Sequence, residues 1–437
     1  MSRRAILIKE GHLIDPAQGI DEPRDLLIED GVVKEVKKGI RPNGADLVDA
    51  KGKTVSPGFI DLHVHLRSPG QEHKETVLTG SRAAALGGFA TVCSMANTDP
   101  VVDSATVVDY IRNQSARIGL VRILPFAAVT VGLKGEILTE MGDLKEAGAA
   151  GFSDDGVPVM NAGIMRRALE YSRITGLPVV AHCEDKNLAG NGVVNQGRTS
   201  TRLGLPGIPS EAETIMIARD LLLAEATGGR LHIAHVSTEA GVALIRSAKA
   251  KGIRVTAEVT PHHLVLTEES LGTYDARFKM NPPLRTQKDQ EALRAGLEDG
   301  TIDAIATDHA PHAVSEKEME LPLAPFGVIG LETALGVLLT KLVHRGNVRL
   351  KTVIAALTAG PAAVLGINRG TLRVGSPADV TIFDPQANWA VDRETFASKG
   401  INSPFLDWGL KGRVTDLVVD GRIILRNRRF TTNGDHA

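Results

Sequence analysis

One stretch decides how the chain folds: Phe59-Ile60-Asp61-Leu62-His63-Val64-His65-Leu66-Arg67. Apolar and polar residues alternate with a period of two, which predicts a β-strand with one apolar face. Asp61, His63, His65 and Arg67 share the other face. Two imidazoles at positions i and i+2 can bind one metal ion, and the next guanidinium can bind a carboxylate held beside that ion. Two histidines that happen to lie near a strand end are the plainer interpretation, so a metal site requires matching ligands elsewhere.

The middle of the chain alternates between strand patterns and helix patterns. Strands are expected at 59–66, 90–95, 122–127, 151–153, 178–182, 231–235, 254–259 and 303–307. Helical patterns lie between most of them, at 76–86, 104–115, 162–175, 211–226, 239–251 and 289–298. Eight strands with helical crossovers predict an α/β protein built on a (β/α)₈ TIM-like barrel over residues 56–365.

Both ends of the chain contain short strand patterns instead. Asp-Gly pairs at 30–31 and 420–421 are typical of hairpin turns, because these residues tolerate positive φ. Residues 1–55 look too short to close a core alone. We therefore expect residues 1–55 and 366–437 to meet in one small β-sandwich domain.

The overall composition excludes some classes of partner. The 437 residues include 50 Lys and Arg against 52 Asp and Glu, a formal net charge of −2 that gives no reason to expect nucleic acid or an anionic membrane. No apolar run of about 18 residues is present, so no membrane span is expected. Only two cysteines, Cys93 and Cys183, indicate a reducing compartment, and we expect a cytoplasmic protein.

Polar residues gather where the predicted strands end, which is where barrels of this kind carry their sites. They are His63, His65, Asp154, Asp155, His182, His235 and Asp308. Spacing alone cannot separate Asp154 from Asp155. Imidazoles and carboxylates without a thiolate suit Zn²⁺ or a similar divalent ion.

The number of candidate ligands exceeds what one tetrahedral ion needs. Two ions that share a bridging carboxylate and a bridging hydroxide would use them better, and such a pair lowers the pKa of bound water and polarises a carbonyl. Asp308 would bind metal and also act as general base and then general acid. The expected reaction is hydrolysis, or the reverse condensation, at an amide-like carbon.

Several motifs resemble the amidohydrolase superfamily and, more narrowly, the class I dihydroorotases of bacteria. The superfamily motifs are His63-x-His65, Ala181-His182-Cys183-Glu184-Asp185, His235-Val236-Ser237-Thr238 and Thr307-Asp308-His309-Ala310-Pro311-His312. The narrower motifs are Asp61–Arg67, Met95-Ala96-Asn97-Thr98, Phe152-Ser153-Asp154-Asp155-Gly156, Lys279-Met280-Asn281-Pro282-Pro283-Leu284-Arg285 and Pro325-Phe326-Gly327. The resemblance covers nearly the whole chain, in order.

The resemblance implies a set of residue roles. One zinc ion would be held by His63, His65, Asp155 and Asp308, and a second by Asp155, His182 and His235, with Asp155 as the bridge. The substrate α-carboxylate would be bound by Arg67, Asn97 and His312, and the ring amides by Asn281 and the backbone at Phe326 and Gly327. His65 would also lie against the substrate. The implied reaction is the reversible cyclisation of N-carbamoyl-L-aspartate to L-dihydroorotate and water, in pyrimidine biosynthesis.

One position departs from the wider superfamily. Hydantoinases and allantoinases bridge their metals with a carboxylated lysine on strand four, but residues 151–160 contain no lysine and Lys145 lies in a predicted helix. Asp155 takes that place and is shorter, so the second metal ion is expected to be held less tightly than the first.

Other functions compete with the leading hypothesis. The nearest is another cyclic-amide hydrolase, of the hydantoinase or allantoinase type. The more distant is a non-catalytic scaffold for aspartate carbamoyltransferase, which loss of metal ligands would support, although every expected ligand is present. A homodimer and a complex with aspartate carbamoyltransferase alongside catalysis are also compatible with the resemblance. The charged residues of 313–325 directly follow strand eight and could form a lid or an ordinary exposed loop.

Overall fold

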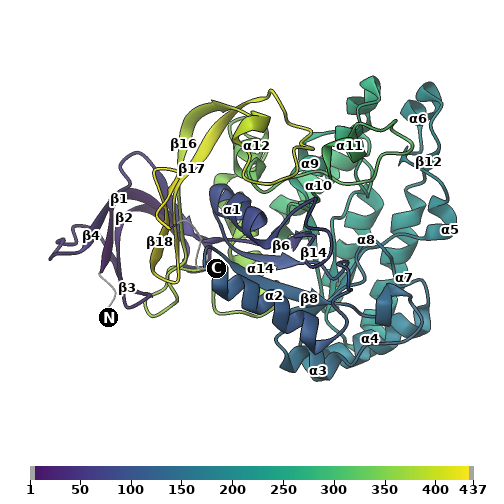
Figure 1. Ribbon diagram of the computed structural model, residues 1–437, viewed down its shortest axis with the longest axis horizontal. Coiled ribbons are helices and arrows are strands. Elements are labelled where there is room, and N and C mark those ends of the chain that lie inside the picture. The colour runs from purple at the N-terminus through teal and green to yellow at the C-terminus, as the bar shows by residue number, and fades with distance from the viewer. Residues whose placement is uncertain (1–4, 433–437) are drawn as a thin grey trace.

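The computed structural model describes residues 5–432, and its larger part is a barrel of parallel strands (Figure 1). The strands are β6 (Phe59–Val64), β7 (Phe89–Ser94), β8 (Arg122–Ala127), β9 (Gly151–Phe152), β10 (Val179–Ala181), β13 (Leu231–Ile233), β14 (Val255–Val259) and β15 (Ala304–Ile305). Hydrogen bonds join them in the order β15-β14-β13-β10-β9-β8-β7-β6. A parallel bridge between Val64 and His309 links the two edges. The predicted barrel and its eight strands are confirmed.

Helices surround the barrel strands (Figure 1). The predicted ones are α1 (Val77–Gly87), α2 (Ala105–Ile118), α4 (Ala162–Thr175), α7 (Glu211–Thr227), α8 (Glu239–Ala250) and α10 (Gln287–Glu298). The remaining helices are α3 (Met141–Glu146), α5 (Lys186–Ala189), α6 (Arg198–Leu203), α9 (Pro261–Val265), α11 (Val314–Lys317), α12 (Ala334–Leu338), α13 (Leu350–Leu357) and α14 (Ala359–Leu365). A short pair, β11 (Val194–Asn195) and β12 (Gly207–Ile208), lies outside the barrel sheet. Among residues 5–432, no helix is both long enough and apolar enough to cross a membrane.

The alternation in β6 separates core from site. Ile60 and Leu62 are buried in an apolar cluster with Val364 and Leu365 of α14. Asp61 and His63, on the opposite face, are equally buried but make polar contacts across the barrel. The period of two therefore directs the imidazoles into the barrel, as the sequence predicts.

Strands from both ends of the chain form the small domain. They are β1 (Ile6–Asp15), β2 (Ile20–Glu29), β3 (Val32–Lys37), β4 (Asp46–Asp49), β5 (Thr54–Pro57), β16 (Val380–Ala390), β17 (Gly409–Val419), β18 (Arg422–Arg426) and β19 (Arg429–Phe430). Antiparallel pairing of β5 with β16 joins the two ends into one nine-stranded sheet with its own apolar core. The predicted meeting of the two ends is confirmed. Residues 1–4 and 433–437 lie outside the described part of the chain. The predicted domain boundaries, at 55/56 and 365/366, stay a prediction.

The connection between β16 and β17 leaves the small domain and reaches the barrel mouth (Figure 1). Ala397 N and Ser398 N donate hydrogen bonds to the carboxylate of Glu332. Asn402 Nδ2 donates to Ala310 O and Gly327 O. Part of the C-terminal segment is thus built into the end of the barrel where the sequence places its polar residues.

Candidate functional site

Four imidazoles surround one carboxylate at the mouth of the barrel. Asp155 Oδ1 lies 3.3 Å from His63 Nε2 and 3.5 Å from both His182 Nδ1 and His235 Nε2. Asp155 Oδ2 lies 3.4 Å from His65 Nε2. All five side chains are buried. They come from the ends of β6, β9, β10 and β13, so four separate strand ends converge on one point.

Asp308, just beyond β15, completes this cluster. Its Oδ1 lies 3.2 Å from His65 Nε2 and 3.6 Å from His63 Nε2. Burial by itself raises the pKa of Asp308, but the adjoining charges of His63 and His65 outweigh it and hold the pKa below its ordinary range. Asp308 therefore stays ionised at neutral pH.

The cluster fits divalent metal ions. Two groups, His63 with His65 and Asp155, and Asp155 with His182 and His235, each bring their ligand atoms within 4.8 Å of one another. His63 Nε2 and Asp155 Oδ1 are buried and have no hydrogen-bond partner. Because an unpaired buried polar atom is costly, a cation that accepts both atoms as ligands accounts for them. Asp155 belongs to both groups, and its role as a bridging ligand stays a prediction.

Two of the imidazoles, those of His63 and His182, are more basic than a free imidazole. Burial lowers the pKa of His182, but the neighbouring carboxylates of Asp155 and Glu184 outweigh it and raise that pKa to about 9. The pKa of His63 is likewise well above its ordinary value, because Asp155 and Asp308 outweigh its burial. Metal ligands must be deprotonated, so a bound cation would replace these protons.

A buried glutamate that was not predicted from the sequence, Glu258, orients His63. Glu258 Oε1 lies 3.0 Å from His63 Nδ1, and Glu258 Oε2 lies 3.1 Å from His232 Nε2. Burial raises the pKa of Glu258, but contacts with His232 and His63 bring it to about 2. A carboxylate on Nδ1 leaves Nε2 directed at Asp155 and the candidate metal site. The sequence feature that could have predicted this role is the single glutamate within strand β14.

Two aspartates support the backbone around the ligands. Asp61 accepts hydrogen bonds from Thr307 N and Oγ1, at 3.0 and 2.6 Å, and from His63 N at 3.1 Å. It thereby ties the first strand to the segment that carries Asp308. Asp154 instead accepts from the backbone nitrogens of residues 129 and 130, at 2.7 and 3.0 Å. The structure thus places Asp155, not Asp154, among the imidazoles.

The residues expected to bind the substrate carboxylate lie beside the cluster. Asn97 Oδ1 is 2.9 Å from His65 Nδ1. Arg67 Nε donates to Pro311 O, and its guanidinium lies 3.4 Å from His312 Nε2. Burial and the charges of Arg67 and Lys317 lower the pKa of His312 to about 3, so this imidazole is neutral.

The groups expected to bind the ring amides already have partners within the chain. Asn281 Nδ2 donates to Glu184 Oε2 at 3.0 Å. Phe326 O lies 2.8 Å from His312 Nε2, and Gly327 N donates to Lys279 O at 3.0 Å. These residues are therefore present at the mouth, and their contact with a substrate stays a prediction.

Segment 313–325 is tied down by two lysines. Lys317 Nζ donates to Pro325 O and Gly327 O, both at 2.9 Å. Lys279 Nζ donates to Leu321 O at 2.8 Å and to Pro322 O at 3.0 Å. The segment includes α11 and is more than a plain exposed loop, while its movement as a lid is untested.

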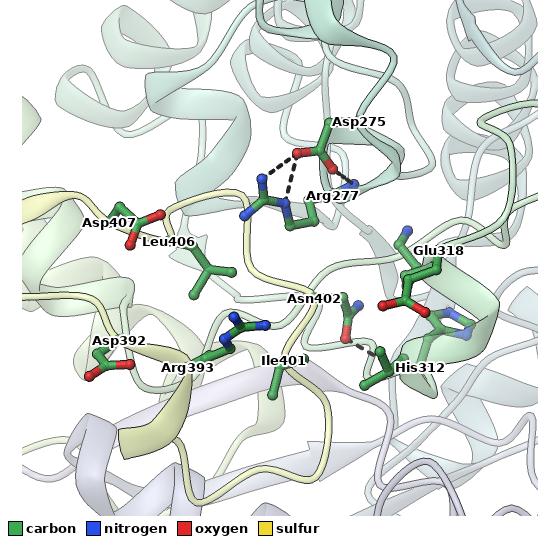
Figure 2. Close-up of a pocket in the computed structure, with 12 residues that line it drawn as sticks. Asp275, Arg277, His312, Glu318, Asp392, Arg393, Ile401, Asn402, Leu406 and Asp407 are labelled. Atoms are coloured by element: carbon green, nitrogen blue, oxygen red, sulfur yellow. Dashed lines mark hydrogen bonds and ion pairs between the residues drawn. The ribbon is translucent and has the colours of Figure 1, made fainter.

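A cavity of about 440 Å³ adjoins His312 (Figure 2). Its walls come from three separate parts of the chain: residues 275–277, residues 312–318 and the 392–407 part of the β16–β17 connection. Figure 2 shows Asn402 and His312 side by side at its edge. The C-terminal segment is therefore a wall of the space next to the site.

Comparison with known proteins places this geometry in a family. A family model described as "Dihydro-orotase-like" matches residues 52–240. A protein named dihydroorotase from Pelotomaculum thermopropionicum is 53% identical over 423 residues, which cover 97% of this chain and 99% of the relative. One from Caldanaerobacter subterraneus is 50% identical over 426 residues, covering 97% and 98%. The solved L-hydantoinase (dihydropyrimidinase) from Arthrobacter aurescens has a TM-score of 0.88 at 27% identity, covering 98% of this chain and 97% of its own.

Proposed function

The chain belongs to the dihydroorotase family, and on that premise we propose that it interconverts L-dihydroorotate and N-carbamoyl-L-aspartate as a cyclic amide hydrolase. One observation carries the proposal: a single carboxylate, Asp155, lies among four imidazoles with the ionised Asp308 beside them. This donor set, adjoining an arginine and a neutral histidine, suits hydrolysis of an amide in an anionic substrate.

Zinc is the metal we propose for the site. The nitrogen and oxygen donors without a thiolate suit it, and Cys183 Sγ is directed at Asp220 instead. One ion would be held by His63, His65, Asp155 and Asp308, and the second by Asp155, His182 and His235. When bound, such ions supply Lewis acidity, which lowers the pKa of water and polarises a carbonyl.

Asp308 is the proposed general base and acid. Its carboxylate is ionised and can accept a proton from the water that attacks the ring carbonyl carbon. As the carbon–nitrogen bond of the ring breaks, the same group returns the proton to the leaving nitrogen. Condensation follows these steps in reverse. His63 and His65 lie within 3.6 Å of Asp308 and hold its carboxylate in place.

Arg67, Asn97 and His312 are proposed to bind the substrate α-carboxylate. The guanidinium of Arg67 offers a planar fork of donors, and Pro311 O fixes its Nε. Neutral His312 adds no second charge next to Arg67. Hydantoin and allantoin lack this carboxylate, so these residues favour dihydroorotate over them.

Hydantoin hydrolysis is the second candidate, because the solved hydantoinases share the fold closely. The strand-four segment speaks against it, since residues 151–160 contain no lysine to be carboxylated and Asp155 occupies the centre of the cluster. Four further predictions stay open: a homodimer, a complex with aspartate carbamoyltransferase, a purely scaffolding role and a cytoplasmic location. Gel filtration with and without the transferase tests the homodimer and the complex.

The deciding experiment measures turnover of L-dihydroorotate by the purified protein, with zinc determined on the same sample and hydantoin and allantoin as controls. Turnover of dihydroorotate alone, with bound zinc, is expected. Zinc without dihydroorotate turnover, or turnover of hydantoin instead, would overturn the substrate assignment.

A further inference from the structure

Asn402 lies at a junction between segments that are distant in the sequence. Its side chain is buried, with 3% of the residue exposed. Asn402 Oδ1 accepts a hydrogen bond from His312 N at 3.2 Å, the dashed line in Figure 2. Asn402 Nδ2 donates to Ala310 O at 3.0 Å and to Gly327 O at 3.1 Å. One amide thus uses both donors and its acceptor to join residues 310–312 to residue 327.

The main chain of Asn402 reinforces this junction. Ile329 N donates to Asn402 O at 3.2 Å, and Ala310 N donates to Val328 O at 2.8 Å. The segments around residues 310, 328 and 402 therefore form a small layer over the end of β15. His312 and Gly327 are fixed relative to one another by this layer, because each contacts the same amide.

Two carboxylates, the half-buried Glu332 and the buried Glu75, hold the segment that delivers Asn402. Glu332 accepts from Ala397 N at 3.0 Å, and Glu75 Oε2 accepts from Ser398 Oγ at 2.5 Å. Gly400 then passes close to Pro311: a Cβ at position 400 would lie 2.7 Å from Pro311 Cβ and 2.8 Å from Asn402 Oδ1. Only a glycine permits this approach without displacing a neighbour.

We propose that Asn402 is a positioning residue of the active site, which holds the His312 imidazole at the distance from the Gly327 backbone that the substrate requires. The inference rests on the proposed function, in which His312 contacts the substrate carboxylate. It assigns a role in substrate binding to the C-terminal segment, which otherwise belongs to the small domain.

The test compares Asn402→Ala and Asn402→Asp with Asn388→Ala, a control at an exposed asparagine in β16. We expect Asn402→Ala to lower kcat/KM for L-dihydroorotate about tenfold, mainly through a higher KM, with zinc content unchanged. Asn402→Asp should be at least as impaired, because its carboxylate replaces two donors that face carbonyl oxygens. Asn388→Ala should match the unsubstituted protein.

A double-mutant cycle with His312→Ala separates positioning from general structural support. If Asn402 acts through His312, Asn402→Ala should change kcat/KM by less than about threefold in the His312→Ala background. An equal loss in both backgrounds, or an unchanged kcat/KM in the folded single variant, would overturn the proposal. If Asn402→Ala fails to fold, Gly400→Ala takes its place in the experiment. Gly400→Ala should show the same rise in KM and the same dependence on His312. An unchanged KM in Gly400→Ala would count against the proposal. Absence of dihydroorotate turnover in the unsubstituted protein would overturn the proposed function instead.

Discussion

The two ends of the barrel both gather charged side chains, but the charges are paired differently. At the end of the barrel where β8 begins, called the closed end, Arg122 pairs with Asp379 and Asp420 at 3.1 and 2.5 Å. Arg369 pairs with the same two carboxylates at 2.6 and 2.9 Å. Each arginine there faces two carboxylates. At the mouth, Asp155 lies among four imidazoles, and one of its oxygens has no hydrogen-bond partner. The first arrangement joins two domains, whereas the second leaves atoms for a ligand.

Several residues at the mouth have a positive φ, which residues other than glycine rarely adopt. Arg67, His235 and Asp308 have φ of 57°, 32° and 46°. Each such residue costs about 1–3 kcal/mol and persists only where its surroundings hold it. Asp61 holds the residue before Asp308, and Glu213 accepts from the backbone nitrogens of residues 237 and 238, just after His235. Buried carboxylates thus support the backbone next to two of these three residues, Asp308 and His235.

Removing the carboxylate charge of Asp308 should have the largest effect on the mouth. We expect Asp308→Asn to lower kcat for L-dihydroorotate by about a thousandfold, because the proton of the attacking water then has no acceptor. Steady-state kinetics with the melting temperature on the same sample measure this. Asp109→Asn, at an exposed position of α2, is the matched control. A kcat within tenfold of the original would remove Asp308 from the proton transfer.

Arg67→Ala comes next. Loss of the guanidinium should lower kcat/KM about a hundredfold, because the substrate carboxylate would be buried without its partner. Zinc content should survive, since Arg67 is not among the metal-ligand groups. Kinetics and metal analysis on one preparation give both values, with Arg373→Ala as an exposed control. Unchanged turnover would mean that another group binds the carboxylate.

Glu258→Gln tests whether a buried carboxylate behind a ligand tunes the mouth. Metal affinity should fall by about 10- to 100-fold, because the amide no longer fixes the ring and charge of His63. Competition with a chelator measures the dissociation constant. Retained affinity in a folded variant would show that Glu258 is only a packing residue.

At the closed end, a comparable substitution should alter stability and spare activity. Asp379→Asn leaves Arg122 and Arg369 with fewer carboxylate contacts, and we expect unfolding to become about 3 kcal/mol easier. Urea unfolding measures this, alongside kcat/KM per zinc-loaded site, which should not change. A loss of kcat/KM without a loss of stability would contradict the division of roles between the two ends.

The smallest effect concerns pH and Lys317. Burial and the charge of Lys279 lower the pKa of Lys317 from 10.5 to about 7. Between these values the unfolded chain binds more protons than the folded one, so this group makes the free energy of unfolding rise with pH from 7 towards 10.5. Lys317→Met removes that contribution. The free energy of unfolding of the original protein minus that of the variant should therefore rise between pH 7 and pH 9. Urea unfolding of both proteins at each pH measures this. A constant value would show that Lys317 is not titrating.

Features that depend on local pattern were predictable from the sequence. Alternation in 59–67 and the placement of polar residues at strand ends predicted the barrel. They also predicted that one mouth would hold His63, His65, His182, His235 and Asp308. The physical reason is that strand period and chain order already fix which side chains point inward and at which end. The helices followed from the same kind of periodicity, and α4 spans the predicted residues 162–175.

The contacts between distant segments were decided only by the tertiary structure. It separated Asp155 from Asp154, which neighbour one another in sequence but differ in whether imidazoles or backbone amides lie within reach. It placed Glu258 behind His63 and Asn402 beside His312, across about 195 and 90 residues of chain. No local period encodes such pairs, because they exist only once the barrel has closed and the C-terminal segment has packed over its mouth.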